Sequence, residues 1–291
     1  MSAVNATGRV ALCFLAARPH LGRAWRRPGR NAWWLARKTA GALGLLQPLD
    51  NRGDFRRGLD VAIASIHRHA ASVPPILLLS PESTAPPPGV ERVVPIDARR
   101  FEAATRCNYS MGGLSAYFKI ALFALEGWER LVYLDCDTLA LGDVSALWDL
   151  DRFADRALYA VRETAEMGPW GESLGKLNTG VMVVNAPLLD RRVEAKMLDL
   201  VQRGRSYDCG DQGVINAFLD EERVAAGELP EEYNVFVNDR IGARWPRIAD
   251  RAKLLHFVGP KKPWSADYAR AYPFGRDFKT RWDEAARDVA L

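Results

Sequence analysis

Leu-Val-Tyr-Leu-Asp-Cys-Asp-Thr-Leu, residues 131–139, is an apolar run that ends in the acidic pair Asp135 and Asp137. Such a run predicts a buried strand over Arg130–Leu134, and ligands of open α/β sheets bind where strands end. Side chains two residues apart in extended backbone point the same way, so these carboxylates repel each other unless a cation lies between them. A hard divalent ion there has room for phosphate oxygens, although an ordinary strand-end turn also fits the pair.

Helices and apolar strands alternate along the rest of the chain, which predicts an α/β sheet covered on both faces. Apolar runs predict further strands at Val10–Leu15, Ile76–Leu79, Glu91–Pro95, Ala157–Val161, Gly180–Val184 and Lys253–Val258. Helical spacing predicts helices at Asn31–Leu46, Asp54–Ala70, Gly112–Gly127, Leu188–Arg203, Gly210–Leu219 and Gly275–Val289.

Composition excludes several classes of protein. The 291 residues are 48% hydrophobic and 26% charged, which rules out wholesale disorder. No apolar run approaches the roughly 18–20 residues that cross a bilayer, so we expect no transmembrane helix. The four cysteines, at positions 13, 107, 136 and 209, are widely spaced. They predict reduced thiols in a cytoplasmic protein and neither a disulfide framework nor a zinc site.

The net charge of +4 arises from one end of the chain, because the first acidic residue is Asp50. This local excess does not support nucleic acid as a partner. The segment Arg18–Lys38 mixes arginine with Trp25, Trp33 and Trp34. Such a mixture suits peripheral contact with an anionic membrane, through residues 18–46, or a polyanionic acceptor. The alternative is a solvated insertion whose tryptophans cover the edge of a groove.

Three polar clusters lie downstream of the acidic pair. Asn178 and Thr179 precede an apolar strand, and Asp208, Asp211 and Gln212 surround a helix start at which Asp211 is a candidate N-cap. His256 lies in an apolar run followed by Gly259, Lys261 and Lys262. An imidazole with two carboxylates suits Mn²⁺ better than Mg²⁺, and a lysine can neutralise a departing diphosphate. A strand histidine and turn lysines also have ordinary structural explanations.

Four motifs in order resemble glycosyltransferase family 8, and the last resembles its glycogenin branch. They are Tyr-Leu-Asp-Cys-Asp-Thr-Leu (133–139), Leu-Asn-Thr-Gly-Val-Met-Val-Val-Asn (177–185), Gly-Asp-Gln-Gly-Val-Ile-Asn (210–216) and Leu-His-Phe-Val-Gly-Pro-Lys-Lys-Pro-Trp (255–264). The resemblance covers roughly residues 54–264. It implies a single-domain GT-A fold over residues 1–291, with a Rossmann-like, mostly parallel mixed sheet, helices on both faces and an insertion at about 18–52.

The resemblance also implies a role for each matching residue. Asp135, Asp137 and His256 would be the ligands of Mn²⁺, with Mg²⁺ as the alternative ion. Asp211 and Gln212 would be the catalytic pair beside the sugar. The donor-binding residues would be Lys119, Cys136, Asn178, Thr179, Asp208, Gly259 and Lys262. Asp54 and Phe55 match only part of the family's uridine-binding loop, which leaves the base-binding contacts unassigned.

The implied activity is transfer of a hexose from a UDP-sugar with retention of configuration, to a glycan, a lipid-linked glycan or a small polyol. A neutral amide such as Gln212 is a weak nucleophile, and Asp211 is chemically stronger but can also serve only to orient hydroxyls. We therefore expect the acceptor to attack on the face from which the phosphate departs. Two alternatives stay open: a nucleotidyl- or phosphoryl-transfer enzyme with the same acidic pair, and a non-catalytic sugar-nucleotide-binding protein.

Overall fold

The computed structural model describes residues 10–16, 55–82, 85–106, 114–167, 173–208, 210–258, 261–272, 274–287 and 289. The strands are β1 (Val10–Leu15), β2 (Ile76–Ser80), β3 (Arg92–Pro95), β4 (Arg130–Leu134), β5 (Thr138–Ala140), β6 (Leu158–Arg162), β7 (Leu177–Asn185), β8 (Ala226–Glu228), β9 (Val235–Phe236) and β10 (Leu254–His256). The α-helices are α2 (Phe55–His69), α3 (Arg191–Gln202), α4 (Asp211–Glu221), α5 (Ile241–Ile248), α6 (Tyr268–Ala271) and α7 (Gly275–Arg287), and the longer 3₁₀ helices are η2 (Ala98–Arg106) and η3 (Leu114–Ala124).

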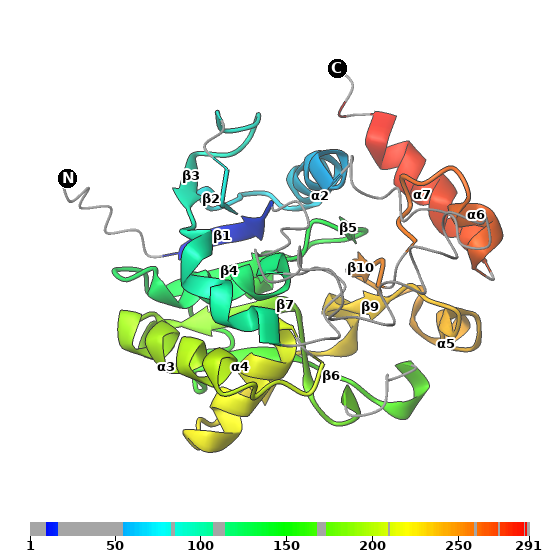
Figure 1. Cartoon of the computed structure of the whole chain (residues 1–291). Helices are drawn as coiled ribbons and strands as arrows, with labels where there is room; N and C mark the ends of the chain where they lie inside the picture. The colour runs from blue at the N-terminus through cyan, green and yellow to red at the C-terminus, as the bar shows by residue number, and fades with distance from the viewer. Residues whose placement is uncertain are drawn as a thin grey trace, which may run out of the picture.

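Within the described residues, the main sheet has seven strands in the order β3-β2-β1-β4-β7-β6-β8. In Figure 1 the strands β3, β2, β1, β4 and β7 follow one another from top to bottom. Strands β3, β2, β1 and β4 run parallel to one another, and β6 and β8 are also parallel. Strand β7 is antiparallel to both of its neighbours, β4 and β6. The sheet is therefore mixed and mostly parallel, as predicted, and β4 lies at its centre beside β7.

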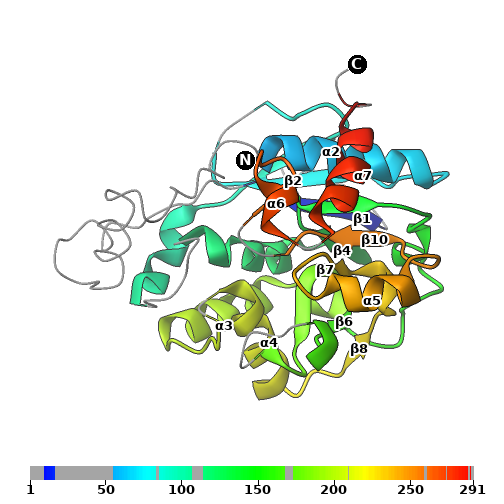
Figure 2. The ribbon, with the colours of Figure 1, turned by 90° about the vertical axis from the view of Figure 1, so that its right-hand side faces the viewer.

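Helices cover both faces of this sheet. Figure 2 shows α2 and α7 on one side of the strands and α3 and α4 on the other. Alternate residues of each central strand enter two separate apolar clusters: Leu131 and Tyr133 pack toward η3, α3 and α4, whereas Val132 and Leu134 pack toward α2. Burial on both faces explains why these strands are continuous apolar runs. Each fully buried Leu or Val contributes roughly 1.5–3 kcal/mol of hydrophobic free energy.

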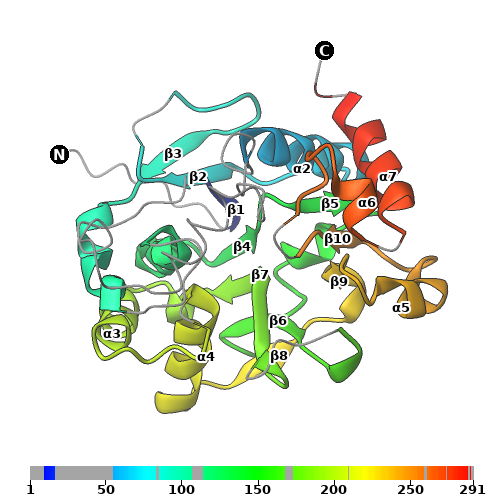
Figure 3. The same cartoon turned by 45° about the vertical axis from the view of Figure 1, so that its right-hand side comes forward.

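A second, smaller sheet joins distant parts of the chain. Strand β10 pairs antiparallel with β5 and parallel with β9, giving the order β5-β10-β9. This sheet packs with α5, α6 and α7 in a third apolar cluster that includes Val235, Leu255 and Phe257. In Figure 3 it lies beside the carboxyl end of β4, next to α5 and α6. The small sheet thus brings β10 alongside the segment that follows the acidic pair.

Several predicted elements differ from the observed ones. The segment predicted as a helix over Gly112–Gly127 is a 3₁₀ helix over Leu114–Ala124, whose buried apolar residues include Tyr117, Phe118 and Ile120. The strand predicted over Gly180–Val184 is longer and begins at Leu177. The predicted helix Asn31–Leu46 and the insertion at about 18–52 lie outside the described residues.

None of the helices in the described part of the chain combines the length and apolar character needed to cross a membrane. Cys13 and Cys136 are free and buried, in agreement with the predicted reduced thiols, and Cys107 and Cys209 lie outside the described residues. Burial raises the pKa values of the Cys13 and Cys136 thiols well above the usual range for a cysteine. Both side chains therefore stay protonated and pack as small apolar groups.

Candidate metal and sugar-nucleotide site

The acidic pair lies at the carboxyl end of β4, in the turn that leads into β5. The backbone N–H of Asp135 donates to the carbonyl of Gly180 at 2.8 Å, which keeps this end of β4 attached to β7. The hydroxyl of Thr138 donates to the carbonyl of Asp135 at 2.8 Å and closes the turn. The hydroxyl of Tyr133 donates to Oδ1 of Asp135 at 2.7 Å. The orientation of the Asp135 carboxylate is therefore fixed by its own strand.

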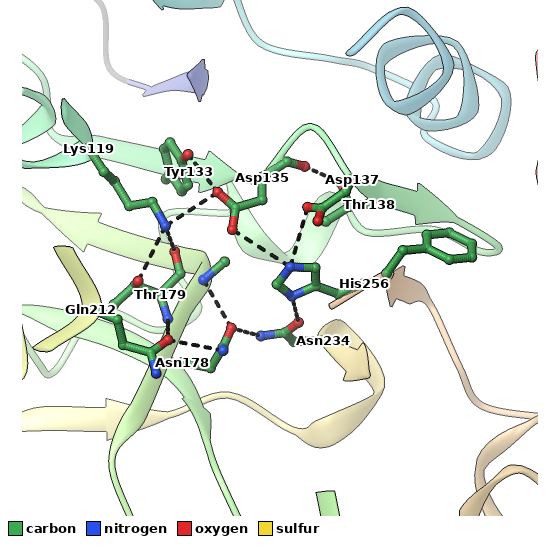
Figure 4. Close-up of polar contacts among 12 residues, drawn as sticks. Lys119, Tyr133, Asp135, Asp137, Thr138, Asn178, Thr179, Gln212, Asn234 and His256 are labelled. Atoms are coloured by element: carbon green, nitrogen blue, oxygen red, sulfur yellow. Dashed lines mark hydrogen bonds and ion pairs between the residues drawn. The ribbon is translucent and has the colours of Figure 1, made fainter. Parts of the chain in front are cut away.

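His256 reaches the acidic pair because β5 pairs with β10. Thr138 lies opposite His256 in this antiparallel ladder, and the N–H of Phe257 donates to the carbonyl of Asp137 at 2.9 Å. Nε2 of His256 consequently lies 3.4 Å from Oδ1 of Asp137 and 3.7 Å from Oδ2 of Asp135 (Figure 4). The predicted meeting of these three residues is confirmed.

The three side chains have the composition of a metal site. One ligand atom from each of Asp135, Asp137 and His256 lies within 4.8 Å of the others, and within the described residues this is the one such cluster of three. Asp137 and His256 are buried and Asp135 is partly open, so an ion held here keeps positions for ligands from solvent or substrate. Two carboxylate oxygens and an imidazole nitrogen together suit a first-row divalent ion. The donor set therefore fits a divalent metal.

Two lysines contact the acidic groups: Lys119 lies beside Asp135 and Asp211, and Lys262 lies beside Asp137. Nζ of Lys119 lies 3.3 Å from Oδ1 of Asp135 and 3.6 Å from Oδ2 of Asp211, and it donates to the carbonyl of Thr179 at 3.0 Å. Burial alone would lower the pKa of Lys119, but Asp135 and Asp211 outweigh it and raise that pKa. Nζ of Lys262 donates to Asp137 and, at 2.9 Å, to the carbonyl of Phe257.

The surroundings shift the pKa values of Asp137 and Asp211 in opposite directions. Burial would raise the pKa of Asp137, but Lys262 and His256 outweigh it and hold that pKa well below its usual range. For Asp211 burial prevails: with the repulsion of Asp135 and Asp208 it raises the pKa to about 7, against the opposing charge of Lys119. The carboxylate expected to bind metal is thus ionised at neutral pH, whereas Asp211 titrates near neutrality.

Asp211 does not have the helix-capping role predicted for it, and Asp208 binds the backbone amides at the start of α4 instead. Asp211 is the first residue of α4, and its side chain makes no hydrogen bond as an N-cap. Oδ1 of Asp208 instead accepts from the backbone N–H of Gly210 at 2.9 Å and of Gly213 at 3.0 Å. The expectation that Asp211 caps this helix is wrong, because Asp208 takes the free amides. Asp211 is left to face Lys119.

Asn178, Thr179 and Gln212 form one hydrogen-bonded group with Glu163. Oε1 of Gln212 accepts from the N–H of Thr179 at 3.1 Å and from Nδ2 of Asn178 at 3.0 Å. Oε1 of Glu163 accepts from Nδ2 of Asn178 at 2.9 Å and from Nε2 of Gln212 at 3.0 Å. Nε2 of Gln212 also donates to the hydroxyl of Tyr207 at 2.9 Å. These polar groups of β7 and α4 lie next to the cluster of Asp135, Asp137 and His256, and their binding of a sugar stays a prediction.

Two buried residues of this site, Glu163 and Asn234, were not among the predicted site residues. Glu163 is buried directly after β6, and Asn234 is completely buried before β9, where its side chain contacts both His256 and Asn178. Neither belongs to a recognisable local motif. The one available signal is a polar residue at the end of a short apolar run, which is common in surface loops.

For two of the expected donor-binding residues, Cys136 and Gly259, the described part of the structure shows no side chain that faces the acidic pair. The side chain of Cys136 points into the apolar cluster beneath α2, away from the two carboxylates that flank it in sequence. A donor could therefore contact this residue only through its backbone. Gly259 lies outside the described residues.

A sequence model of glycosyl transferase family 8 matches residues 82–268. General stress protein A of Bacillus subtilis is 25% identical over 199 residues, which cover 61% of this chain and 68% of the relative. Glycogenin of Neurospora crassa is 30% identical over 152 residues, 52% of this chain and 20% of the relative. The lipopolysaccharide 1,2-glucosyltransferase of Escherichia coli is 25% identical over 175 residues, 51% and 48% of the two chains. The match thus spans less than half of the latter two relatives.

Solved structures show the same architecture. The galactosyltransferase LgtC, solved with donor and acceptor sugar analogs, superposes with a TM-score of 0.62 at 16% identity, covering 97% of this chain and 96% of LgtC. The glycosyltransferase GlyE of Streptococcus pneumoniae superposes with a TM-score of 0.56 at 16% identity, covering 96% and 63% of the two chains. These similarities show that the expected GT-A fold is correct.

Proposed function

The chain belongs to glycosyl transferase family 8, and from this premise we propose that it transfers a hexose from a UDP-sugar to a hydroxyl acceptor, with Mn²⁺ bound and with retention of configuration. The observation that carries the proposal is that the ligand atoms of Asp135, Asp137 and His256 lie together, with Lys119 beside Asp135 and Lys262 beside Asp137. Mg²⁺ is the less favoured ion, because it prefers oxygen ligands alone.

The residues divide into a diphosphate side and a sugar side. A divalent ion held by Asp135, Asp137 and His256 would supply Lewis-acid stabilisation of the negative charge that develops on the leaving UDP. Lys262, whose ammonium lies beside Asp137, would contribute positive charge to the same phosphate oxygens. On the other side, the amide and carboxylate groups of Asn178, Gln212 and Glu163 would bind and orient the hydroxyls of the hexose.

Retention can arise from a covalent intermediate or from attack on the face that the phosphate leaves. Oε1 of Gln212 already accepts two hydrogen bonds, and a neutral amide oxygen is a weak nucleophile. Asp211 is held beside Lys119, and burial raises its pKa to about 7 in the metal-free chain, which makes it a weaker candidate for a permanently charged nucleophile. We therefore favour same-face attack: the acceptor oxygen bonds to C1 as the bond from C1 to phosphate oxygen breaks, and the departing phosphate takes the acceptor proton.

The acceptor is proposed only as a class: a hydroxyl of a glycan, of a lipid-linked glycan or of a small polyol. Similarity to glycogenin makes self-glucosylation a second candidate. Intact-mass measurement after incubation with UDP-glucose and Mn²⁺ separates the two, because only self-glucosylation adds the mass of a hexose to the chain.

The donor proposal is tested with a panel of UDP-sugars, scored for UDP release with Mn²⁺ and with a chelator. We expect release only with Mn²⁺, and loss of release in Asp137→Asn. The exposed Asp151 gives a matched control, since Asp151→Asn removes the same charge away from the site. Release that survives in Asp137→Asn or in chelator would contradict the proposal. Consumption of nucleoside triphosphates would favour nucleotidyl transfer, and binding of a UDP-sugar without turnover would favour a non-catalytic role.

A further inference from the structure

His256 can hold a metal ion only if the nitrogen that faces the acidic pair carries a lone pair. A neutral imidazole has its proton on Nδ1 or on Nε2, and the partner of one nitrogen decides the state of the other. Nε2 of His256 faces Asp135 and Asp137, while Nδ1 lies 2.9 Å from Oδ1 of Asn234 (Figure 4). The identity of the atom that Asn234 presents to Nδ1 is therefore decisive.

Fixed hydrogen-bonding groups on two sides determine the orientation of the Asn178 amide. The backbone N–H of Gly180, which can only donate, lies 3.0 Å from Oδ1 of Asn178. The carboxylate of Glu163, which accepts when ionised, lies 2.9 Å from Nδ2 of the same amide. Both constraints give the same orientation, with the oxygen of Asn178 toward Gly180 and its nitrogen toward Glu163.

The orientation of the Asn178 amide determines the orientation of the Asn234 amide, which in turn determines the tautomer of His256. Oδ1 of Asn178 is an acceptor, so the group of Asn234 that lies 2.9 Å from it must be the donor, Nδ2. Oδ1 of Asn234 then faces Nδ1 of His256 and can only accept. We infer that Asn234 is a positioning residue that holds the proton of His256 on Nδ1 and so keeps the Nε2 lone pair directed at the ion-binding point.

The groups around His256 explain why Asn234 is needed to hold the proton on Nδ1. Without an acceptor at Nδ1, the nearby carboxylates of Asp135 and Asp137 would favour a proton on Nε2, at the place where an ion has to bind. With Asn234 present, that tautomer would leave the Nδ1 lone pair facing a buried carbonyl oxygen, an unfavourable contact between two acceptors. Asn234 is fully buried and the ring packs edge-on against Phe236, so neither partner can turn away to solvent.

The inference rests on the proposed function only in assuming that an ion binds here. Partners of this kind typically change metal affinity by about 10–100-fold when they are removed. We therefore expect Asn234→Ala to weaken Mn²⁺ binding by about 10–100-fold.

The matched control is Asn238→Ala. Asn238 is also buried and also holds two segments together, but it does so by donating to the carbonyl of Met167 at 2.8 Å and accepting from the N–H of Arg240 at 3.1 Å. Titration of the full chain with Mn²⁺, followed by electron paramagnetic resonance in the absence of any donor, gives the affinities. Because no sugar is transferred in this measurement, failure of the proposed function leaves its result intact.

A second measurement reads the tautomer itself. The chain contains four histidines, so histidine-selective ¹⁵N labelling of the metal-free protein, with His256→Gln for assignment, identifies both ring nitrogens. For the neutral imidazole we expect the proton on Nδ1 in the unsubstituted chain and on Nε2, wholly or in part, in Asn234→Ala. A proton on Nε2 in the unsubstituted chain would overturn the inference. Equal Mn²⁺ affinity in Asn234→Ala and the unsubstituted chain, or an equal loss in Asn238→Ala, would also overturn it.

Discussion

Gly180 lies so close to His256 that no side chain fits between them. A Cβ atom at position 180 would be 2.1 Å from Cε1 of His256 and 3.0 Å from Oδ2 of Asp135. Its backbone is not in the left-handed region, so the need for glycine comes from this contact. Gly180 therefore gives the imidazole the space to reach the acidic pair.

We expect Gly180→Ala to displace the imidazole and to lower the free energy of unfolding by about 1–3 kcal/mol, as other overpacked cores do. Mn²⁺ binding should weaken as well, because Nε2 moves away from the carboxylates. Gly142→Ala is the matched control: its Cβ would have 4.0 Å to the nearest atoms, and we expect a change below about 1 kcal/mol. Calorimetric titration with Mn²⁺ and urea unfolding check both variants, and a Gly180→Ala variant that binds Mn²⁺ normally would refute this explanation.

Lys119 is the buried positive charge between Asp135 and Asp211. Lys119→Met would keep the bulk of the side chain but leave both carboxylates without this partner. We expect the metal-free protein to lose about 3 kcal/mol of stability, near the lower end for broken buried ion pairs, because Asp135 keeps partial access to solvent. Urea unfolding in the presence of a chelator measures the loss.

Lys176 provides the comparison, because it pairs with Asp220 on the surface. Lys176→Met should cost less than about 1 kcal/mol. Equal losses in the two variants would show that Lys119 acts as an ordinary surface charge.

The raised pKa of Asp211 predicts a pH-dependent stability. Its pKa is about 7 in the folded chain and near 3.8 ordinarily, so the folded state holds the proton more tightly. The resulting stabilisation is complete below the ordinary pKa and is lost as the pH rises through about 7. Relative to Asp211→Asn, the unsubstituted metal-free chain should lose up to about 4 kcal/mol between acidic and mildly alkaline pH.

Urea unfolding at a series of pH values, with chelator, tests this prediction. Asp220→Asn, on the exposed side of the same helix, serves as the control and should not reproduce the trend. A difference between Asp211→Asn and the unsubstituted chain that is independent of pH would be the contrary result.

Asp208 lies two residues before the N-cap of α4, Gly210, and its Oδ1 accepts from the N–H groups of Gly210 and of Gly213 in the first turn. Asp208→Ala should therefore lower stability by about 1 kcal/mol, the usual value of an N-cap, whereas Asp208→Asn should retain it because the amide oxygen still accepts. Thermal unfolding compares the two variants. The KM of Asp208→Asn for the donor tests the separate prediction that Asp208 binds the sugar, and an unchanged KM would remove it from the donor-binding residues.

The main sheet was predictable because its central strands are buried on both faces. The apolar runs around Val10, Ile76 and Leu131 form strands within a residue or two of their predicted bounds. The short strands β5, β8 and β9 were not predicted, because two or three residues carry no periodic pattern. Helix α5 was also missed, and Pro246 within it argues against a helix at the level of sequence.

In the candidate site, too, residues within a local sequence pattern were predictable and residues brought together by distant pairing were not. Asp135 and Asp137 were evident from their position after an apolar strand, but no local pattern placed His256 beside them, and its assignment relied on ligand chemistry and on the resemblance to a family. The physical cause of that contact is the pairing of β5 with β10, which is a non-local event. Asn234 and Glu163 were unpredictable for a similar reason: each is defined by partners that are distant in sequence, such as His256 and Asn178.

The central claim is that Asp135, Asp137 and His256 hold one divalent ion. Its most direct test is a count of the Mn²⁺ ions bound per chain, by electron paramagnetic resonance of the purified protein, compared with Asp135→Asn, Asp137→Asn and His256→Gln. The account predicts one tightly bound ion in the unsubstituted chain and none at the same Mn²⁺ concentration in each of the three variants. Equal binding by all four proteins would contradict it.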